Sequence, residues 1–278
     1  MMQTTEKTVR ARNTVIPALG FGTYELTGSD CREMVRVALE AGYRHIDTAQ
    51  VYDNEEQVGA GIKDAGTDRE SFFLTTKVWF DNYEPAKLET SVENSLRKLK
   101  TDYVDLLLLH WPVFEGSMEP TLEALLKQKE KGRTKAVGIS NFTLSQLEKA
   151  CEITGQNLVT NQVEYHPFLD QSKMLDRLAQ KEMALTAYSP LARGKIFEDE
   201  TVTEIARQHG VDAAQITLAW LLGQPGVVAI PKSSSREHAL SNFKGAEIEL
   251  SAEERAAIDK LGSPEGRLID PSFAPDWD

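Results

Sequence analysis

The chain has 278 residues, of which 41% are hydrophobic and 27% charged, and its formal net charge is −12. A chain of this length and composition can bury a complete core, and an α/β barrel of roughly 250 residues forms one domain. The acidic balance argues against nucleic-acid binding and against binding to anionic membranes, because both need an excess of Lys and Arg on one face. We therefore expect one domain over residues 1–278.

The cysteines and the amino terminus indicate where the protein acts. Cys31 and Cys151 lie in separate helical patterns, and their spacing fits neither a disulfide framework nor a metal site. No apolar stretch approaches the ~18 residues of a membrane span, and Met1–Asn13 is polar rather than signal-like. These features predict a cytoplasmic protein with no membrane or nucleic-acid partner, and we expect a monomer.

Secondary structure is expected to alternate between strands and helices along the chain. A β-hairpin around Asn13, within Val9–Val15, comes first and could cover the lower mouth of a barrel. Eight strand-like segments follow: Ala18–Thr23, Arg44–Asp47, Phe72–Lys77, Val104–His110, Ala136–Ser140, Val159–Glu164, Ala184–Tyr188 and Val227–Pro231. Helical spacing of apolar residues is found between them, at Asp30–Ala41, Asn54–Asp64, Pro85–Leu99, Glu119–Lys131, Leu144–Ile153, Ser172–Gln180 and Thr201–Gln208.

This alternation runs without a composition break, which predicts a closed (β/α)8 barrel, or TIM barrel. Ala213–Leu222 and Ala252–Lys260 are expected to be extra helices. Arg267–Asp278 is a short, polar, Pro-containing tail that can fold over the active-site mouth.

Three strand-like runs end in the ionisable residues Asp47, Lys77 and His110. Because the carboxyl ends of barrel strands converge on the face where such folds do chemistry, these side chains are expected to lie together. Tyr52 follows Asp47 by five residues, and a neighbouring Lys77 would favour the phenolate and lower the tyrosine pKa from about 10. Tyr52 could then donate a proton while His110 holds a substrate oxygen.

Aromatic residues follow three strands and predict an apolar wall beside these groups: Tyr24, Trp79 and Trp111. Taken singly, the four polar residues have ordinary explanations, namely a buried ion pair, a loop tyrosine and a barrel-end histidine. Their placement at the ends of three successive strands favours an active site.

A metal site is the weaker alternative. His45 and Asp47 alternate on one strand, as ligands of barrel metallohydrolases do, but such sites use several His and carboxylate ligands. Only His110 and His166 remain near strand ends, and His166 is expected to be structural. We expect no metal.

Motifs between Val9 and Gly262 resemble those of the aldo-keto reductase family: Gly20–Thr23, Gly42–Ala49 with Tyr52, Thr76–Trp79, Leu109–Pro112, Gly138–Phe142, Asn161–Pro167 and Ile230–Ser233. The compact loops and the ending Phe273–Asp278 are most similar to the bacterial 2,5-diketo-D-gluconate reductases of the B type. The resemblance implies NADPH-dependent reduction of small aldehydes and ketones, with methylglyoxal-like α-dicarbonyls and diketo-sugar acids as carbonyl substrates.

The resemblance also implies roles for individual residues. Asp47, Tyr52, Lys77 and His110 match the catalytic tetrad, with Tyr52 as the general acid in reduction. NADPH would bind in an extended form without a Rossmann domain, and the chain has no strand-linked G-x-G-x-x-G. The implied cofactor contacts run from the nicotinamide to the adenosine: Gly22, Thr23, Ser140, Asn141, Gln162, Tyr188, Ser189, Leu191, Ile230, Lys232, Ser233, Ser234, His238 and Asn242. The implied substrate contacts are Tyr24, Trp79, Trp111, Phe273 and Trp277.

Two positions depart from the family pattern, and two others have a second interpretation. Ser140 and Asn141 could instead cap the helix that follows them. Glu25 replaces a Lys that is common near the pyrophosphate, and we expect it to face solvent. His238 stands where many relatives have an Arg that contacts the 2′-phosphate of NADPH, so NADH is expected to be accepted more weakly than NADPH but measurably.

Two other functions remain open from the sequence. Lys77 could be the nucleophile of a Schiff-base aldolase on the same barrel. Alternatively, the chain could be a structural protein that binds nucleotide without turnover, although the complete set of four polar residues argues against this.

Overall fold

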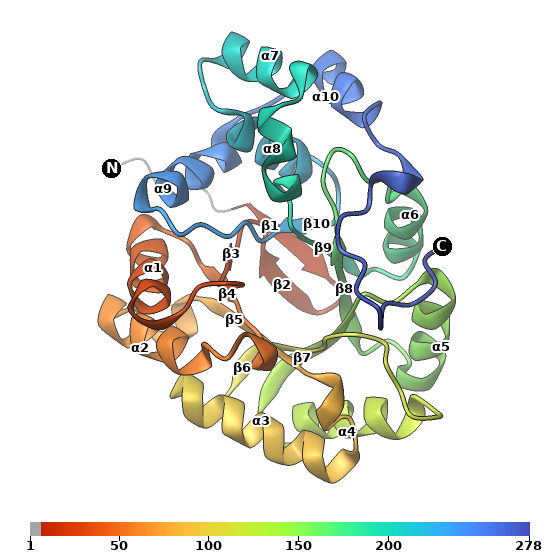
Figure 1. Cartoon of the computed structure of the whole chain (residues 1–278). Helices are drawn as coiled ribbons and strands as arrows, with labels where there is room; N and C mark the ends of the chain where they lie inside the picture. Colours follow the sequence, from red (N-terminus) through yellow and green to blue (C-terminus); the bar gives the residue numbers. More distant parts are fainter. Residues whose placement is uncertain (1–6) are drawn as a thin grey trace.

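The computed structural model describes residues 7–278 as a parallel eight-stranded sheet inside a ring of helices (Figure 1). The strands pair in chain order: β3 (Phe21–Gly22), β4 (His45–Asp47), β5 (Phe73–Val78), β6 (Val104–Leu109), β7 (Thr134–Ser140), β8 (Leu158–Glu164), β9 (Ala184–Tyr188) and β10 (Val227–Ala229). Bridges from Leu19 to Ala229 and from Gly22 to Lys232 join the first strand to the last. The predicted (β/α)8 barrel is confirmed.

The amino-terminal hairpin is also confirmed, with strands β1 (Thr8–Ala11) and β2 (Thr14–Pro17) antiparallel. Arg12 adopts a positive φ of 52° in the tight turn between them. The hairpin crosses the middle of the ring behind the sheet (Figure 1), and Ala11 and Ile16 are fully buried. It therefore closes the end of the barrel at which the strands begin.

Helices surround the sheet, with α7 and α10 further out than α8 (Figure 1): α1 (Gly28–Ala41), α2 (Glu55–Ala65), α3 (Pro85–Leu99), α4 (Glu119–Glu130), α5 (Leu144–Thr154), α6 (Ser172–Gln180), α7 (Glu200–His209), α8 (Ala213–Leu222), α9 (Arg236–Lys244) and α10 (Ala252–Asp259). They bury the outer face of strands whose inner face fills the barrel, so β5 and β6 are buried along their whole length. Within residues 7–278 no helix combines the length and apolarity needed to cross a membrane.

One helix was not predicted. α9 follows β10 as the helix of the eighth βα unit, but it begins Arg236-Glu237-His238 and buries only Ala239 and Asn242. A helix this short and polar has no clear apolar periodicity to detect. In contrast, the extra helix predicted at Ala213–Leu222 is α8, which is buried on every side because it is apolar all round.

The packing of α2 against the end of α3 generates a stability prediction. A Cβ at Gly59 would lie 2.7 Å from the carbonyl oxygens of both Lys98 and Leu99. Gly59→Ala should lower the free energy of unfolding by ~1–3 kcal/mol, because this overpacking exceeds the ~1 kcal/mol that Ala gains in helix propensity. Urea unfolding would measure it, with exposed Lys63→Ala on the same helix as the near-neutral control. A stabilised Gly59→Ala protein would contradict the packing seen here.

Candidate functional site

The carboxyl ends of the strands open into a cavity of about 750 Å³. Asp47 ends β4, Tyr52 ends the short 3₁₀ turn η1 (Gln50–Tyr52), and His110 follows β6. These three side chains line the cavity, whereas Lys77 on β5 lies fully buried next to them. The structure thus brings together the four residues that the sequence singled out.

Asp47 and Lys77 form a buried ion pair. The Lys77 Nζ donates to Asp47 Oδ1 at 2.5 Å and to the Thr48 carbonyl oxygen at 2.8 Å, and it lies 3.4 Å from the Tyr52 hydroxyl. The second carboxylate oxygen of Asp47 accepts from Gln162 Nε2 at 2.8 Å. Burial lowers the pKa of Lys77, and the neighbouring Asp47 opposes that shift. Both charges are compensated by contacts within the barrel.

The pKa of Tyr52 shifts in the direction opposite to the one expected from the sequence. Burial raises the pKa of Tyr52 well above its ordinary value, and the Asp47 carboxylate raises it further. The expected lowering by Lys77 does not result, because the ammonium is paired with Asp47 and its charge is largely cancelled. A protonated hydroxyl in this position is a proton donor.

His110 is the second polar group on the cavity floor. Burial lowers the pKa of His110 well below its ordinary value, and the Lys77 charge adds to the effect, so the ring is neutral. Its ring centroid lies 5.7 Å from that of Tyr52 and 5.3 Å from that of Trp79. Nδ1 has no hydrogen-bond partner among the described residues. A neutral imidazole can donate one hydrogen bond, which suits a substrate oxygen beside Tyr52.

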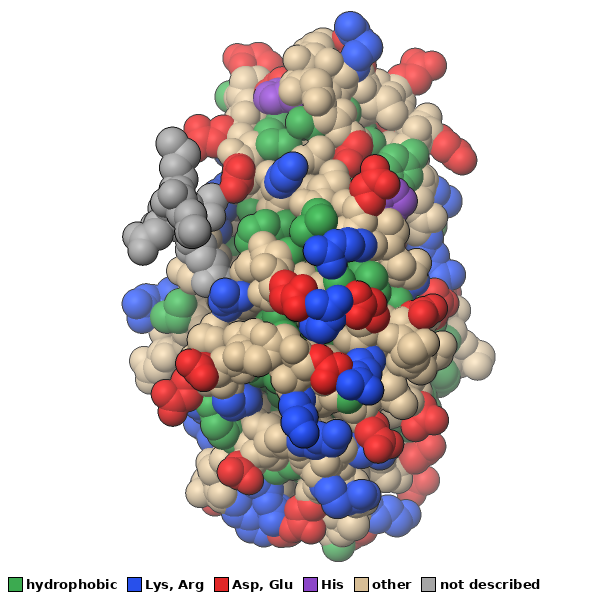
Figure 2. All heavy atoms as spheres, turned by 90° about the vertical axis from the view of Figure 1, so that its left-hand side faces the viewer, with side chains coloured by type: hydrophobic (Ala, Val, Ile, Leu, Met, Phe, Trp, Pro, Cys, Tyr) green, Lys and Arg blue, Asp and Glu red, His purple; other side chains and the backbone are tan. Residues whose placement is uncertain are grey.

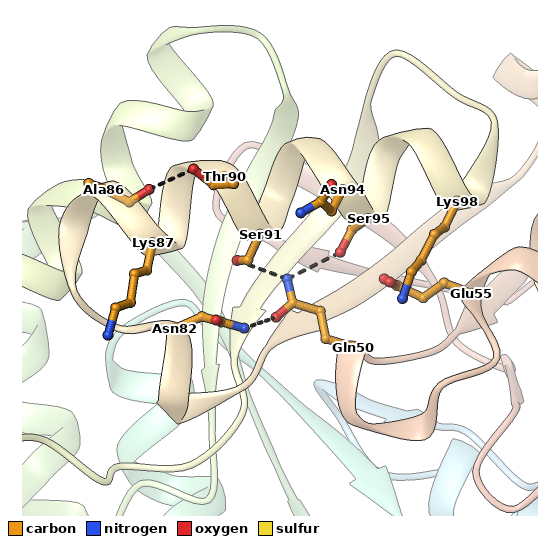
Figure 3. Close-up of a pocket in the computed structure, with 10 residues that line it drawn as sticks. All are labelled: Gln50, Glu55, Asn82, Ala86, Lys87, Thr90, Ser91, Asn94, Ser95 and Lys98. Atoms are coloured by element: carbon orange, nitrogen blue, oxygen red, sulfur yellow. Dashed lines mark hydrogen bonds between the residues drawn. The ribbon is translucent and has the colours of Figure 1, made fainter.

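The turn that carries Tyr52 is fixed by Gln50, which sequence reasoning missed. Figure 3 shows Gln50 pointing from η1 toward α3, where its Nε2 donates to Ser91 Oγ and Ser95 Oγ at 3.1 Å each. Its Oε1 accepts from the Trp79 backbone N–H at 3.1 Å and from Asn82 Nδ2 at 3.2 Å. Gln50 therefore ties the turn of Tyr52 to the loop of Trp79, beside a polar outer cavity of about 520 Å³. Its position between Asp47 and Tyr52 was the only signal in the sequence.

The predicted cofactor residues fall into two groups. Eight line the main cavity: Gly22, Thr23, Asn141, Gln162, Tyr188, Ser189, Ile230 and Lys232. Six lie outside its lining, with four of them at or near α9: Ser140, Leu191, Ser233, Ser234, His238 and Asn242. The interpretation of Ser140 and Asn141 as helix caps is wrong, because Thr143 caps α5 through a capping box with Gln146.

The donor set fits a nicotinamide dinucleotide at both ends. Near Tyr52, Gln162 uses only its Nε2 on Asp47, which leaves its Oε1 as an acceptor for a carboxamide, while Asn141 beside it is held by Tyr188 and by the His110 carbonyl oxygen. At the far end, Ser235 caps α9, and Lys232 stands three residues before this cap. A helix amino terminus beside a lysine suits a phosphate. Glu25 is exposed, as expected, on the cavity rim.

The predicted aromatic wall is present except for one member. Tyr24, Trp79, Trp111 and Phe273 line the cavity. Trp277 lies outside the lining, and its ring packs against that of Trp111 at 6.1 Å between centroids. Residues 268–271 also line the cavity, so the tail lies at the active-site mouth as expected, although the sequence named only Phe273 and Trp277 in it as contacts.

The structure bears on two alternatives weighed from the sequence. Lys77 has no exposed surface and its ammonium is bound to Asp47 and Thr48, which disfavours a Schiff-base nucleophile. Across residues 7–278, no three His, Cys, Asp or Glu side chains are grouped as metal ligands. His166 is fully buried and bound to Glu164, in a structural position.

Comparison with known proteins places these residues in a family. Residues 18–263 match the Aldo/keto reductase family. Methylglyoxal reductase DkgB of Escherichia coli O157:H7 is 44% identical over 272 residues, covering 95% of this chain and 99% of that protein. Glyoxal reductase of Bacillus subtilis strain 168 is 39% identical, covering 93% and 94%. A crystal structure provisionally named 2,5-diketo-D-gluconic acid reductase B superposes with a TM-score of 0.96 at 43% identity, covering 98% of each chain.

The buried ion pair predicts an uneven response to mutation. Lys77→Met should lower the free energy of unfolding by ~3–5 kcal/mol, because it leaves the Asp47 carboxylate buried and without its counter-ion. Asp47→Asn combined with Lys77→Met should recover part of that loss. Chemical unfolding measures both, with Lys98→Met as the control, because Lys98 is partly exposed and 3.9 Å from its partner Asp53. Equal losses in the Lys77 and Lys98 variants would refute the importance of the pair.

Proposed function

The chain belongs to the aldo/keto reductase family, and we propose that it is an NADPH-dependent reductase of small aldehydes and ketones. The observation that carries this proposal is geometric: Tyr52 and His110 line the same cavity with ring centroids 5.7 Å apart, and the Lys77 Nζ, bound to Asp47, lies 3.4 Å from the Tyr52 hydroxyl. This arrangement supplies a proton donor and a hydrogen-bond donor to one oxygen atom.

Each residue then has a defined task in carbonyl reduction. His110 donates a hydrogen bond that orients the carbonyl oxygen toward Tyr52. The Tyr52 hydroxyl gives its proton to that oxygen as negative charge develops on it, and Lys77 at 3.4 Å stabilises the tyrosine oxygen left behind. NADPH, when bound, supplies the hydride that reduces the carbonyl carbon. The product is an alcohol, and Tyr52 recovers its proton from solvent.

The aromatic wall supports small, activated carbonyls as substrates. Tyr24, Trp79, Trp111 and Phe273 confine the space above Tyr52, and relatives carry the names methylglyoxal reductase, glyoxal reductase and 2,5-diketo-D-gluconic acid reductase B. We therefore assign α-dicarbonyls and diketo-sugar acids as the substrate class of a single-domain, monomeric enzyme. The two free cysteines suit a reducing cytoplasm.

Replacing the proton donor tests the proposed function. Tyr52→Phe should reduce kcat for methylglyoxal by at least ~10²-fold, because the hydroxyl is lost while the ring remains. NADPH oxidation measures turnover, and fluorescence titration should show nearly unchanged NADPH affinity. Tyr103→Phe, away from the cavity, serves as the matched control. Near-normal turnover by Tyr52→Phe would remove this residue from the mechanism, and a wild-type protein that reduces neither α-dicarbonyls such as methylglyoxal nor diketo-sugar acids would refute the function.

Cofactor preference should depend on the first turn of α9. His238 is exposed there, and an Arg in its place would be permanently charged and could bind a phosphate through two N–H groups. His238→Arg should raise the preference for NADPH over NADH by roughly tenfold at pH 7.5, the effect of one charge-assisted hydrogen bond. Measuring kcat/KM for both cofactors tests this.

Lys232→Met provides the opposite change at the same end of the cavity. It should weaken NADPH use and leave NADH use almost unaltered, because only NADPH carries the 2′-phosphate. A preference that changes in neither variant would show that the phosphate binds elsewhere.

A further inference from the structure

The last 12 residues, 267–278, form a C-terminal tail that shares the cavity with the catalytic residues. Leu268, Ile269, Asp270, Pro271 and Phe273 line the same space as Tyr52 and His110. In Figure 1 the tail passes the ends of β8 and β9 and finishes beside α5. It has no helix or strand of its own, so its position depends on contacts with the barrel.

The contacts at the start of the tail are made with one carboxylate, whereas Phe273, Trp277 and Asp278 contact the barrel further along. Glu164, the last residue of β8, has no exposed surface. Its Oε1 accepts from the Leu268 backbone N–H at 2.8 Å, and its Oε2 accepts from the Ile269 backbone N–H at 3.0 Å. The Arg267 guanidinium lies 3.7 Å from Oε2, and His166 Nε2 is 2.9 Å from Oε1. One buried side chain thus binds two consecutive amides and a cation at the start of the tail.

The charge state of Glu164 suits this role. Burial alone would raise its pKa, but the hydrogen bonds from His166, Leu268 and Ile269 outweigh burial and hold the pKa below its ordinary range. A carboxylate can accept through both oxygens, whereas a carboxamide offers only one acceptor. The hydrogen bonds to an ionised acceptor are also stronger than those between neutral groups.

Further contacts hold the tail on either side of this attachment. Arg267 stacks 3.6 Å above the Trp277 ring, whose Nε1 donates to Asp270 at 2.9 Å. Gly266 directly precedes the tail and packs against the loop that follows β8. A Cβ at this position would overlap the carbonyl oxygen of Phe168 in that loop. The close contact at Gly266 therefore restricts where the chain can enter the tail, because a larger residue there would have to move away from Phe168.

We propose that Glu164 is the positioning residue that fixes the C-terminal tail as one wall of the substrate site. This inference rests on the proposed function for its kinetic consequence, but its structural part is independent. A substrate long enough to reach from Tyr52 to segment 268–271 depends on where Glu164 holds that segment. A three-carbon substrate that fills only the floor depends on it less.

Hydrogen exchange combined with steady-state kinetics tests the inference on the full chain. Glu164→Gln preserves the shape but removes one acceptor, so the amides of peptide 267–278 should exchange at least ~10-fold faster. For 2,5-diketo-D-gluconate we expect KM to rise at least fivefold more than for methylglyoxal, with kcat changed less than KM, as expected from lost binding.

A second variant approaches the tail from its own side. Gly266→Ala leaves Glu164 intact and should produce the same faster exchange and the same KM pattern by displacing the tail. Asp276→Asn is the control, because it removes a carboxylate from the tail that makes no hydrogen bond to the described residues. It should leave exchange and both KM values unchanged.

The outcomes separate the two proposals. Unchanged tail exchange in both variants would overturn the role of Glu164, as would equally faster exchange in β8 and β9, which would indicate a general loss of stability. Faster tail exchange without the KM pattern, in an enzyme that turns over both substrates, would overturn the substrate part. If the wild-type protein reduced neither substrate, the proposed function would fail while the exchange data still decided how the tail is held.

Discussion

The buried ion pair between Asp47 and Lys77 constrains the rest of the site. Removing two charges from water costs several kcal/mol each, and the cost is offset only when every remaining donor and acceptor is satisfied. Here the partners come from Thr48 and from Gln162 on β8, on the far side of the barrel from β4 in the order of strands. The pair on the adjacent strands β4 and β5 therefore has all of these partners only in a closed barrel, and closure brings Tyr52 and His110 to the same floor.

Closure of the barrel fixes the positions of the strand ends, but it does not fix the loops that follow them. The loops of this site are held by single side chains, one half-buried and one buried, that each have more than one hydrogen-bonding group. Gln50 uses both amide atoms to join η1, the Trp79 loop and α3, and Glu164 uses both carboxylate oxygens on the start of the tail. In each case one polar side chain replaces the regular backbone pairing that a loop lacks.

This difference explains what could be predicted from the sequence. Strands and most helices were recognisable because burial imposes a period on apolar residues, and Asp47, Lys77 and His110 were recognisable as charged ends of apolar runs. Gln50 and Glu164 were not, because their importance lies in partners distant in sequence. α9 was missed because its buried face is only two residues wide. The direction of the Tyr52 pKa shift was wrong because it depends on burial and on Lys77 already being paired.

Charged and neutral groups are distributed unevenly around the cavity. At the floor, Lys77 is compensated by Asp47 and His110 is neutral, so Tyr52 faces a carbonyl without a strong net charge nearby. A neutral floor favours an uncharged carbonyl and keeps Tyr52 protonated, as proton donation in the proposed reduction requires. A positive charge stands elsewhere in the lining, on Lys232, which precedes the amino terminus of α9. In the proposed function, the phosphate of the cofactor and the proton donor Tyr52 are therefore served by different elements, so that a substitution in the first turn of α9 leaves the buried Asp47–Lys77 pair intact.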